Sequence, residues 1–204
     1  GYTLVCPMPN LNPAPDAPET LQVQLDMIAD QACIDVRPFA TITSGRRGGA
    51  VVDMAALKDK VAGFSDDGSG VQNTELMLEA MELAKAEDVG ISAHCEDTDE
   101  PPFSASGEWK QVARDVEMAA LTGCRYHVCH VSTKESVEAI RRAKAAGARV
   151  TCETAPHYLT LTQEDRLAAP KPADGSDDSG RFRMNPPLRE AADRDALIEG
   201  ILDG

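Results

Sequence analysis

Short β-rich runs alternate with longer helical patterns along most of the chain. This alternation is typical of βαβ units arranged around a parallel sheet. The predicted strands lie near Thr3–Met8, Val36–Thr43, Gly63–Ser65, Gly90–Ala93, Arg125–Cys129 and Arg149–Glu153. The predicted helices are Pro18–Ala32, Asp53–Lys60, Asn73–Ala86, Glu108–Leu121 and Lys134–Ala145. The pattern therefore predicts an α/β fold of about six βα units, fewer than the eight of a closed barrel.

Several helix ends carry recognisable signals. Ser132–Glu135 combines a capping hydroxyl with an acidic first turn, and Gly147 follows the same predicted helix as a stop signal. Gly123 ends the preceding helix in the same way, and Asp16 is a candidate N-cap for the first helix. These boundaries support the predicted alternation.

Composition excludes several classes of function. The chain has 204 residues, of which 42% are hydrophobic and 26% charged, which is typical of a folded globular protein. The longest apolar runs fall short of the roughly 20 residues that a membrane span needs. A net charge of −14 argues against nucleic acid, whose phosphates favour basic surfaces. We expect neither a membrane nor a nucleic acid as partner.

Cysteine usage indicates a reducing compartment. The six cysteines form no CxxC pair, and most lie in strand-like runs (Cys6, Cys33, Cys95, Cys124, Cys129 and Cys152). We interpret them as buried free thiols, which predicts a cytoplasmic protein.

Two polar stretches interrupt the alternation. Thr98–Gly107 directly follows a candidate ligand, and residues 168–180 are rich in Pro, Gly, Ser and Asp. We expect residues 168–180 to form a mobile loop. Loops at the carboxyl ends of barrel strands often carry function, so a substrate loop and a plain surface insertion are both open readings.

Polar residues also follow three of the predicted strands at the point where each hydrophobic run ends. Asp67, His94 and His130 occupy these positions, and a carboxylate and two imidazoles from successive strand ends can converge on one metal centre. Asp66-Asp67-Gly68 is also good turn chemistry, so the histidines carry much of the weight for a metal site.

Two further histidines are weaker candidates. His127 and His130 are three residues apart on one strand, so alternation places them on opposite faces, and we expect His127 to be packed or hydrogen-bonded. His157 follows the next strand, and three interpretations of it are open: a ligand, a group that supports the ligands, or neither. The basic loop Ser44–Gly49 is a candidate phosphate site, although an exposed turn is the favoured interpretation.

The chain resembles the zinc-dependent dihydroorotases of the amidohydrolase superfamily, and most closely the bacterial class I type. The resemblance covers essentially the whole chain and rests on six motifs in the order of that family: Met8–Asn10, Phe64–Gly68, His94–Asp97, Tyr126–Thr133, Glu153–His157 and Met184–Arg189. Each motif alone is weak, and six in series are specific.

The resemblance implies a distorted (β/α)8 TIM-like barrel of the amidohydrolase type with two zinc ions at its mouth. Asp67 would bridge the metals, where hydantoinases and allantoinases use a carboxylated lysine. His94 and His130 would be zinc ligands from the fifth and sixth strands. Asn10 would bind the substrate carboxylate, and Asn185 would lie near the dihydropyrimidine ring.

The reaction implied is the reversible hydrolysis of L-dihydroorotate to N-carbamoyl-L-aspartate in pyrimidine biosynthesis, through a hydroxide bridging two zinc ions. The 204 residues lack the family's first-strand His-x-His pair with its arginine, and its eighth-strand general-base aspartate with the histidine that follows. We therefore assign no catalytic base and expect residues 1–204 to form strands 2 to 7 of the parent barrel. The isolated chain is expected to show little or no activity.

Two alternatives are open. A hydantoinase-like or allantoinase-like cyclic amidase would share the barrel, although Asp67 counts against it. A non-catalytic dihydroorotase-like subunit that supports aspartate carbamoyltransferase would explain the missing ligands. For the dihydroorotase itself we expect dihydroorotate or N-carbamoyl-aspartate as small-molecule substrate, a homo-oligomer, and aspartate carbamoyltransferase as a further candidate partner.

Overall fold

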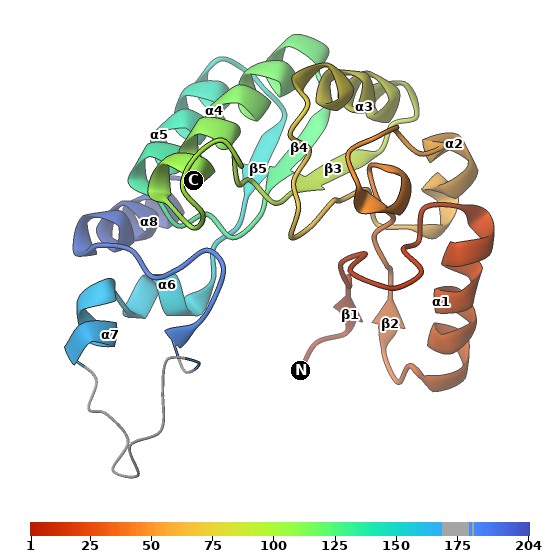
Figure 1. Ribbon diagram of the computed structural model, residues 1–204, viewed down its shortest axis with the longest axis horizontal. Coiled ribbons are helices and arrows are strands. Elements are labelled where there is room, and N and C mark those ends of the chain that lie inside the picture. The colour runs from red at the N-terminus through yellow and green to blue at the C-terminus, as the bar shows by residue number, and fades with distance from the viewer. Residues whose placement is uncertain (169–179, 181) are drawn as a thin grey trace.

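The computed structural model describes residues 1–168, 180 and 182–204 (Figure 1). Apart from Ala168 and Gly180, the loop predicted over residues 168–180 lies outside the described part of the chain. The strands are β1 (Leu4–Val5), β2 (Asp35–Val36), β3 (Gly90–Ala93), β4 (Arg125–Val128) and β5 (Val150–Cys152).

All strand pairings are parallel. β1 pairs with β2, and β3, β4 and β5 form a sheet in that order. Phe64 connects the two groups through bridges to Ala40 and Ile91. Its N–H donates to Gly90 at 3.0 Å, and its carbonyl accepts from Ser92 at 2.8 Å. The predicted strand Gly63–Ser65 thus occupies a position in the sheet through isolated bridges, and six parallel segments follow one another as expected.

The helices cover one side of these strands. They are α1 (Pro18–Gln31), α2 (Met54–Leu57), α3 (Thr74–Ala86), α4 (Ala105–Thr122), α5 (Lys134–Ala145), α6 (Pro156–Thr160), α7 (Gln163–Ala168) and α8 (Ala191–Asp203), with 3₁₀ turns η1 (Ser44–Arg46) and η2 (Lys58–Lys60). Figure 1 shows an arc with strands on its inner side and α3, α4 and α5 on its outer side. β1 lies toward one end of the arc and β5 toward the other, which is the expected partial barrel.

Helix α5 has the predicted bounds because Thr133 and Gly147 act at its two ends as the sequence predicts. The Thr133 hydroxyl accepts a hydrogen bond from the N–H of Ser136 at 3.3 Å. Gly147 has φ +86°, a left-handed conformation that glycine adopts without a Cβ penalty. Between these ends, Val137 and Ile140 face the core.

The starts of two other helices differ from the prediction. Ala17, not Asp16, is the N-cap of α1, and the Asp16 carboxylate instead accepts from the Thr20 hydroxyl and, at 2.8 Å, from the N–H of Gly45. Helix α4 begins at Ala105 rather than Glu108, because the Ser104 hydroxyl caps it. The end of the predicted polar stretch Thr98–Gly107 is therefore helical.

The strand predicted over Val36–Thr43 is shorter than expected. Regular pairing with β1 ends at Val36, because Pro7 has no N–H with which to continue the ladder, although the N–H groups of Arg37 and Phe39 still donate to Val5 and Pro7 at 3.0 Å each. On its other side the segment contacts the next one through Ala40, which bridges to Phe64. At the other end, residues 201–203 are the last part of α8.

The core lies between the strands and the outer helices. Tyr126 and Val128 of β4 are each 1% exposed and point toward the helices. The Tyr126 hydroxyl donates to the buried carboxylate of Asp115 on α4 at 2.6 Å. His127, between them, faces the opposite side, as alternation predicts. No helix in the described residues is long and apolar enough to span a bilayer.

Candidate metal centre

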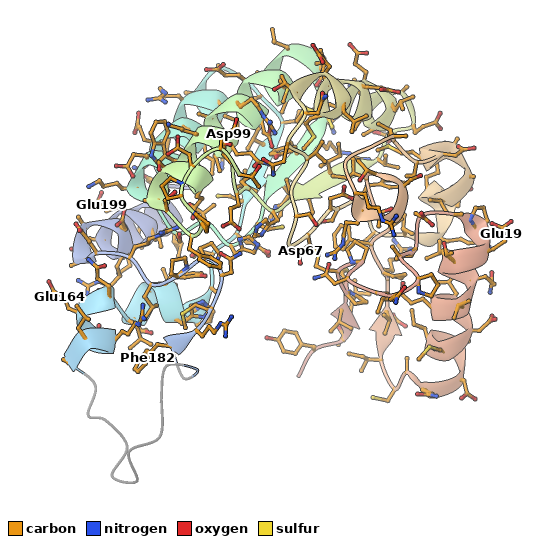
Figure 2. All side chains as sticks on the ribbon, viewed as in Figure 1. Glu19, Asp67, Asp99, Glu164, Phe182 and Glu199 are labelled. Atoms are coloured by element: carbon orange, nitrogen blue, oxygen red, sulfur yellow. The ribbon has the colours of Figure 1, made fainter. Side chains whose placement is uncertain are left out.

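Three potential metal ligands meet at the carboxyl edge of the sheet. Nδ1 of His94 faces Nε2 of His130 at 3.1 Å, and Oδ1 of Asp67 lies 3.6 Å from that Nε2. One ligand atom from each residue falls within 4.8 Å of the others. Figure 2 shows Asp67 on the inner side of the arc. The structure thus brings together the three residues predicted as metal ligands.

The backbone turns sharply at His130. This residue has φ +40°, in the left-handed region, immediately after β4 and Cys129. The strict alternation of a strand therefore no longer sets the direction of its side chain. As a result, His130 reaches His94 just after the neighbouring strand, and the prediction that His127 and His130 lie on opposite faces is wrong.

A buried carboxylate holds the loop after His130. Glu108 of α4 is 5% exposed and accepts hydrogen bonds from the N–H groups of Ser132 at 2.9 Å and Thr133 at 3.0 Å. It also accepts from the Ser136 hydroxyl at 2.9 Å, while Arg189 lies 3.7 Å away. A buried charge needs such compensation, and here it fixes the loop that carries His130.

The orientation of His94 is set by Glu96. Nε2 of His94 lies 3.1 Å from Oε2 of Glu96, so that a proton on Nε2 leaves the Nδ1 lone pair directed at His130. Asn185 donates to the same carboxylate at 3.0 Å, and the N–H of Phe103 donates to its other oxygen at 3.0 Å. Burial acts to raise the pKa of Glu96, but these hydrogen bonds together lower it. Glu96 is therefore ionised and able to accept.

The protonation states suit a cation. Contact with His130 is the main cause that lowers the pKa of Asp67 to about 2, although burial acts in the opposite direction. Burial is also the main cause that lowers the pKa of His94, with the neighbouring His130 adding to it. At neutral pH the cluster presents an ionised carboxylate and a neutral His94, the forms that bind metals.

A pair of side chains from the N-terminal part of the chain reaches Asp67. Asn10 donates to Oδ2 of Asp67 at 2.7 Å, and its own Oδ1 accepts from Arg46 at 2.8 Å. Arg46 also donates to the backbone carbonyl of Asp67. The prediction of an exposed turn at Ser44–Gly49 is wrong for Arg46, whose side chain is half-buried and makes these contacts. The contact joins residues 21 apart, and only the basic character of the loop signalled it.

The remaining candidates lie elsewhere. Asp66 is 1% exposed and is held by the N–H groups of Ile42 and Thr43. His157, at the start of α6, contacts the Tyr158 ring at 4.1 Å between centroids. In the described residues it is not one of the ligands gathered around Asp67. Asn185 reaches this cluster only through Glu96.

The fold defines the class of protein. A parallel βα sheet that curves into part of a barrel, with polar ligands gathered at its carboxyl edge, is the arrangement of barrel hydrolases of the amidohydrolase type. Residues 1–108, more than half of the 204, match the family described as "Dihydro-orotase-like". The chain belongs to this dihydroorotase-like family, and the resemblance inferred from its motifs is confirmed.

Curated relatives are similar over the whole chain. The dihydroorotase of Bacillus caldolyticus is 46% identical over 222 aligned residues, which cover 100% of this chain and 50% of the relative. The dihydroorotase of Staphylococcus aureus strain Mu50 is 43% identical with the same coverage. The chain thus spans about half the length of the curated relatives it matches.

Solved structures share the fold. A D-hydantoinase aligns with 100% of this chain and 49% of its own, with a TM-score of 0.80 and 20% identity. The dihydroorotase of Campylobacter jejuni aligns with 97% of this chain and 57% of its own, with a TM-score of 0.73 and 16% identity. The predicted fold, an incomplete barrel of this type, is confirmed.

Proposed function

We propose that this chain forms part of a zinc-dependent dihydroorotase, which interconverts L-dihydroorotate and N-carbamoyl-L-aspartate in pyrimidine biosynthesis. The observation that carries the proposal is the convergence of Asp67, His94 and His130. It is supported by the relatives of 43–46% identity, which are named dihydroorotases.

The chemistry of the donor set fits zinc. Imidazole nitrogen and carboxylate oxygen are ordinary zinc ligands, with bonds of about 2.0–2.2 Å, so that ligand atoms around one ion lie about 3.3–3.6 Å apart. The two separations within the cluster, 3.1 Å and 3.6 Å, are close to this spacing. In this proposal Asp67, His94 and His130 hold metal. When bound, such a metal lowers the pKa of water to about 7 and polarises an amide carbonyl.

The surrounding residues orient the ligands and the substrate. Glu96 keeps the proton of His94 on Nε2, and Asn185 fixes the Glu96 carboxylate. Asn10 and Arg46 place an amide and a positive charge beside Asp67. In a chain with net charge −14, this local cation favours a substrate carboxylate. We propose that Asn10, assisted by Arg46, binds that carboxylate.

The proposal is tested with a hybrid enzyme. This chain replaces the homologous half of the Bacillus caldolyticus dihydroorotase, with which it aligns over its full length. The zinc-loaded hybrid is expected to hydrolyse L-dihydroorotate, and the Asp67→Asn hybrid is expected to lose at least about 100-fold in kcat/KM, since metal activation supplies several kcal/mol. A folded, zinc-loaded hybrid without turnover contradicts the proposal.

The alternatives predict other outcomes. A hydantoinase-like or allantoinase-like cyclic amidase would give a hybrid that prefers hydantoin or allantoin. A non-catalytic subunit would co-purify with aspartate carbamoyltransferase and fail to bind zinc. The convergent ligands favour the enzyme. The isolated chain is expected to turn over little or no dihydroorotate with added zinc.

Location and assembly are also part of this proposal. All six cysteines are free, which supports a reducing, cytoplasmic location. The prediction that they are buried holds for Cys95, Cys124 and Cys129 and is wrong for Cys6, Cys33 and Cys152, which are exposed. A homo-oligomer, with or without aspartate carbamoyltransferase, is the proposed assembly. Size-exclusion chromatography with light scattering tests it, and a monomer at all concentrations overturns it.

A further inference from the structure

A second group of potential ligands lies on the inner face of the sheet, next to the first. His127 and Cys129 come from β4 and its end, and Glu153 follows β5. One ligand atom from each residue lies within 4.8 Å of the other two. None of them belongs to the cluster of Asp67, His94 and His130.

The His127 ring is already held in a ligand-like orientation. Its Nδ1 lies 2.8 Å from the Thr151 hydroxyl, and its Nε2 lies 3.7 Å from Oε2 of Glu153. Histidines that bind metals usually use one nitrogen for the ion and the other for such a supporting hydrogen bond. Thr151 pairs with His127 across β4 and β5, so backbone register fixes this contact.

The thiol completes the set. Cys129 is 3% exposed, and its Sγ lies within 4.8 Å of ligand atoms of both His127 and Glu153. The Glu153 side chain is 55% exposed and that of His127 is 30% exposed, so solvent reaches the open side of the group. Nitrogen, sulfur and oxygen ligands around one open position resemble the mixed donor sets that suit borderline cations such as zinc.

The spacing also agrees with coordination. In tetrahedral sites, nitrogen and oxygen ligand atoms with bonds of about 2.0–2.2 Å lie about 3.3–3.6 Å apart. The 3.7 Å between Nε2 of His127 and Oε2 of Glu153 is close to this spacing. We propose that His127, Cys129 and Glu153 bind a borderline divalent cation, Zn²⁺ or Co²⁺, at a site separate from the Asp67 cluster. On binding, Cys129 releases its thiol proton to solvent, and the thiolate, imidazole and carboxylate bind the ion.

Sulfur separates the two sites spectroscopically. The Asp67 cluster contains only nitrogen and oxygen ligands, so thiolate-to-cobalt charge transfer in the near ultraviolet does not arise from it. The reduced, chelator-treated full chain is titrated with Co²⁺ under anaerobic conditions. The charge-transfer band is expected in the unaltered chain and in Asp67→Asn, and it is expected to be absent from Cys129→Ser.

Cys152→Ser is the matched control, because Cys152 is the neighbouring thiol on β5 and lies outside the group. It is expected to keep the band. Thr151→Val is expected to weaken Co²⁺ binding about 10–100-fold, the usual effect of removing a supporting partner. Circular dichroism establishes that each variant is folded.

Three results overturn the proposal. They are a folded chain without the band, a band that survives in Cys129→Ser, and a band lost in Cys152→Ser. If Cys129→Ser does not fold, the exposed Glu153→Gln change decides the question. At least a tenfold loss of Co²⁺ affinity is expected there, and unchanged affinity rejects the site.

Discussion

Nδ1 of His94 lies 3.1 Å from Nε2 of His130, although the two residues are 36 apart in sequence. Two imidazole nitrogens at this distance either share a proton or direct both lone pairs at one cation. Burial lowers the pKa of His94, so that at neutral pH this imidazole is neutral and keeps a lone pair for a cation. The contact is therefore the frame of the proposed metal site.

Replacing either imidazole tests this relationship. His94→Asn and His130→Asn are each expected to weaken Zn²⁺ binding at least about 100-fold, because each removes a direct ligand. Loss of a group that only supports a ligand already lowers metal affinity about 10–100-fold. His157→Asn is the control, because His157 lies outside the cluster. Competition with a chelator measures the affinity, with Cys129→Ser in every variant so that the thiol does not contribute. Equal affinities in all three would refute the assignment.

Glu96 is expected to act through the orientation of His94. Glu96→Gln removes the charge that holds the proton on Nε2, so Zn²⁺ affinity should fall about 10–100-fold while the fold is kept. Glu138→Gln, which removes an exposed partner of Arg142 on α5, is the matched control and should change nothing. A Glu96 variant with normal affinity would show that Glu96 has no part in positioning His94.

Arg46 is expected to serve substrate binding. In the hybrid enzyme, Arg46→Ala should raise KM for dihydroorotate about tenfold or more with a smaller change in kcat, because it removes a positive charge beside Asn10. The exposed neighbour Arg47→Ala controls for general charge. Steady-state kinetics measure both constants, and an equal effect of the two changes would argue against a specific contact.

The ionisation of Asp67 links stability to pH. Its pKa is about 2 in the folded chain and 3.8 ordinarily, so the unfolded state binds the proton more tightly. The stabilisation is present above about pH 4 and is lost as pH falls toward 2, amounting to about 2 kcal/mol. Denaturant unfolding of the metal-free chain should show the advantage over Asp67→Asn shrinking by this amount from about pH 5 to about pH 2. A constant difference would contradict the prediction.

Glu108 should matter mainly for stability. Glu108→Ala leaves the N–H groups of Ser132 and Thr133 buried without their acceptor, which should cost about 3 kcal/mol. Glu117→Ala, an exposed change on the same helix, should cost less than about 0.5 kcal/mol. Chemical denaturation compares the two, and similar losses would mean that Glu108 is not the anchor of the loop.

Local signals predicted the regular elements well. Helix α5 begins and ends where Thr133 and Gly147 indicate, and β3 has the predicted bounds. Helices α6, α7 and α8 were not predicted. The first two span five and six residues, and α8 has only Leu197 among its fully buried apolar residues, so its sequence lacks a clear periodic stripe.

The candidate site was only partly predictable from the sequence. Strand ends indicated His94, His130 and an aspartate of the pair Asp66-Asp67, because parallel strands bring their carboxyl ends to one edge. The spacing of the resembled family selected Asp67 from that pair. Arg46 and Glu96 act through contacts made in space. Asn185, for example, meets Glu96 across 89 residues of sequence. No local pattern encodes such a contact.

The most direct test of the account is the activity of the hybrid enzyme on L-dihydroorotate. Zinc-dependent turnover that falls at least about 100-fold on Asp67→Asn is the predicted result. A folded, zinc-loaded hybrid whose turnover is absent, or is unchanged by Asp67→Asn, would contradict the claim that this chain supplies the metal-binding half of a dihydroorotase.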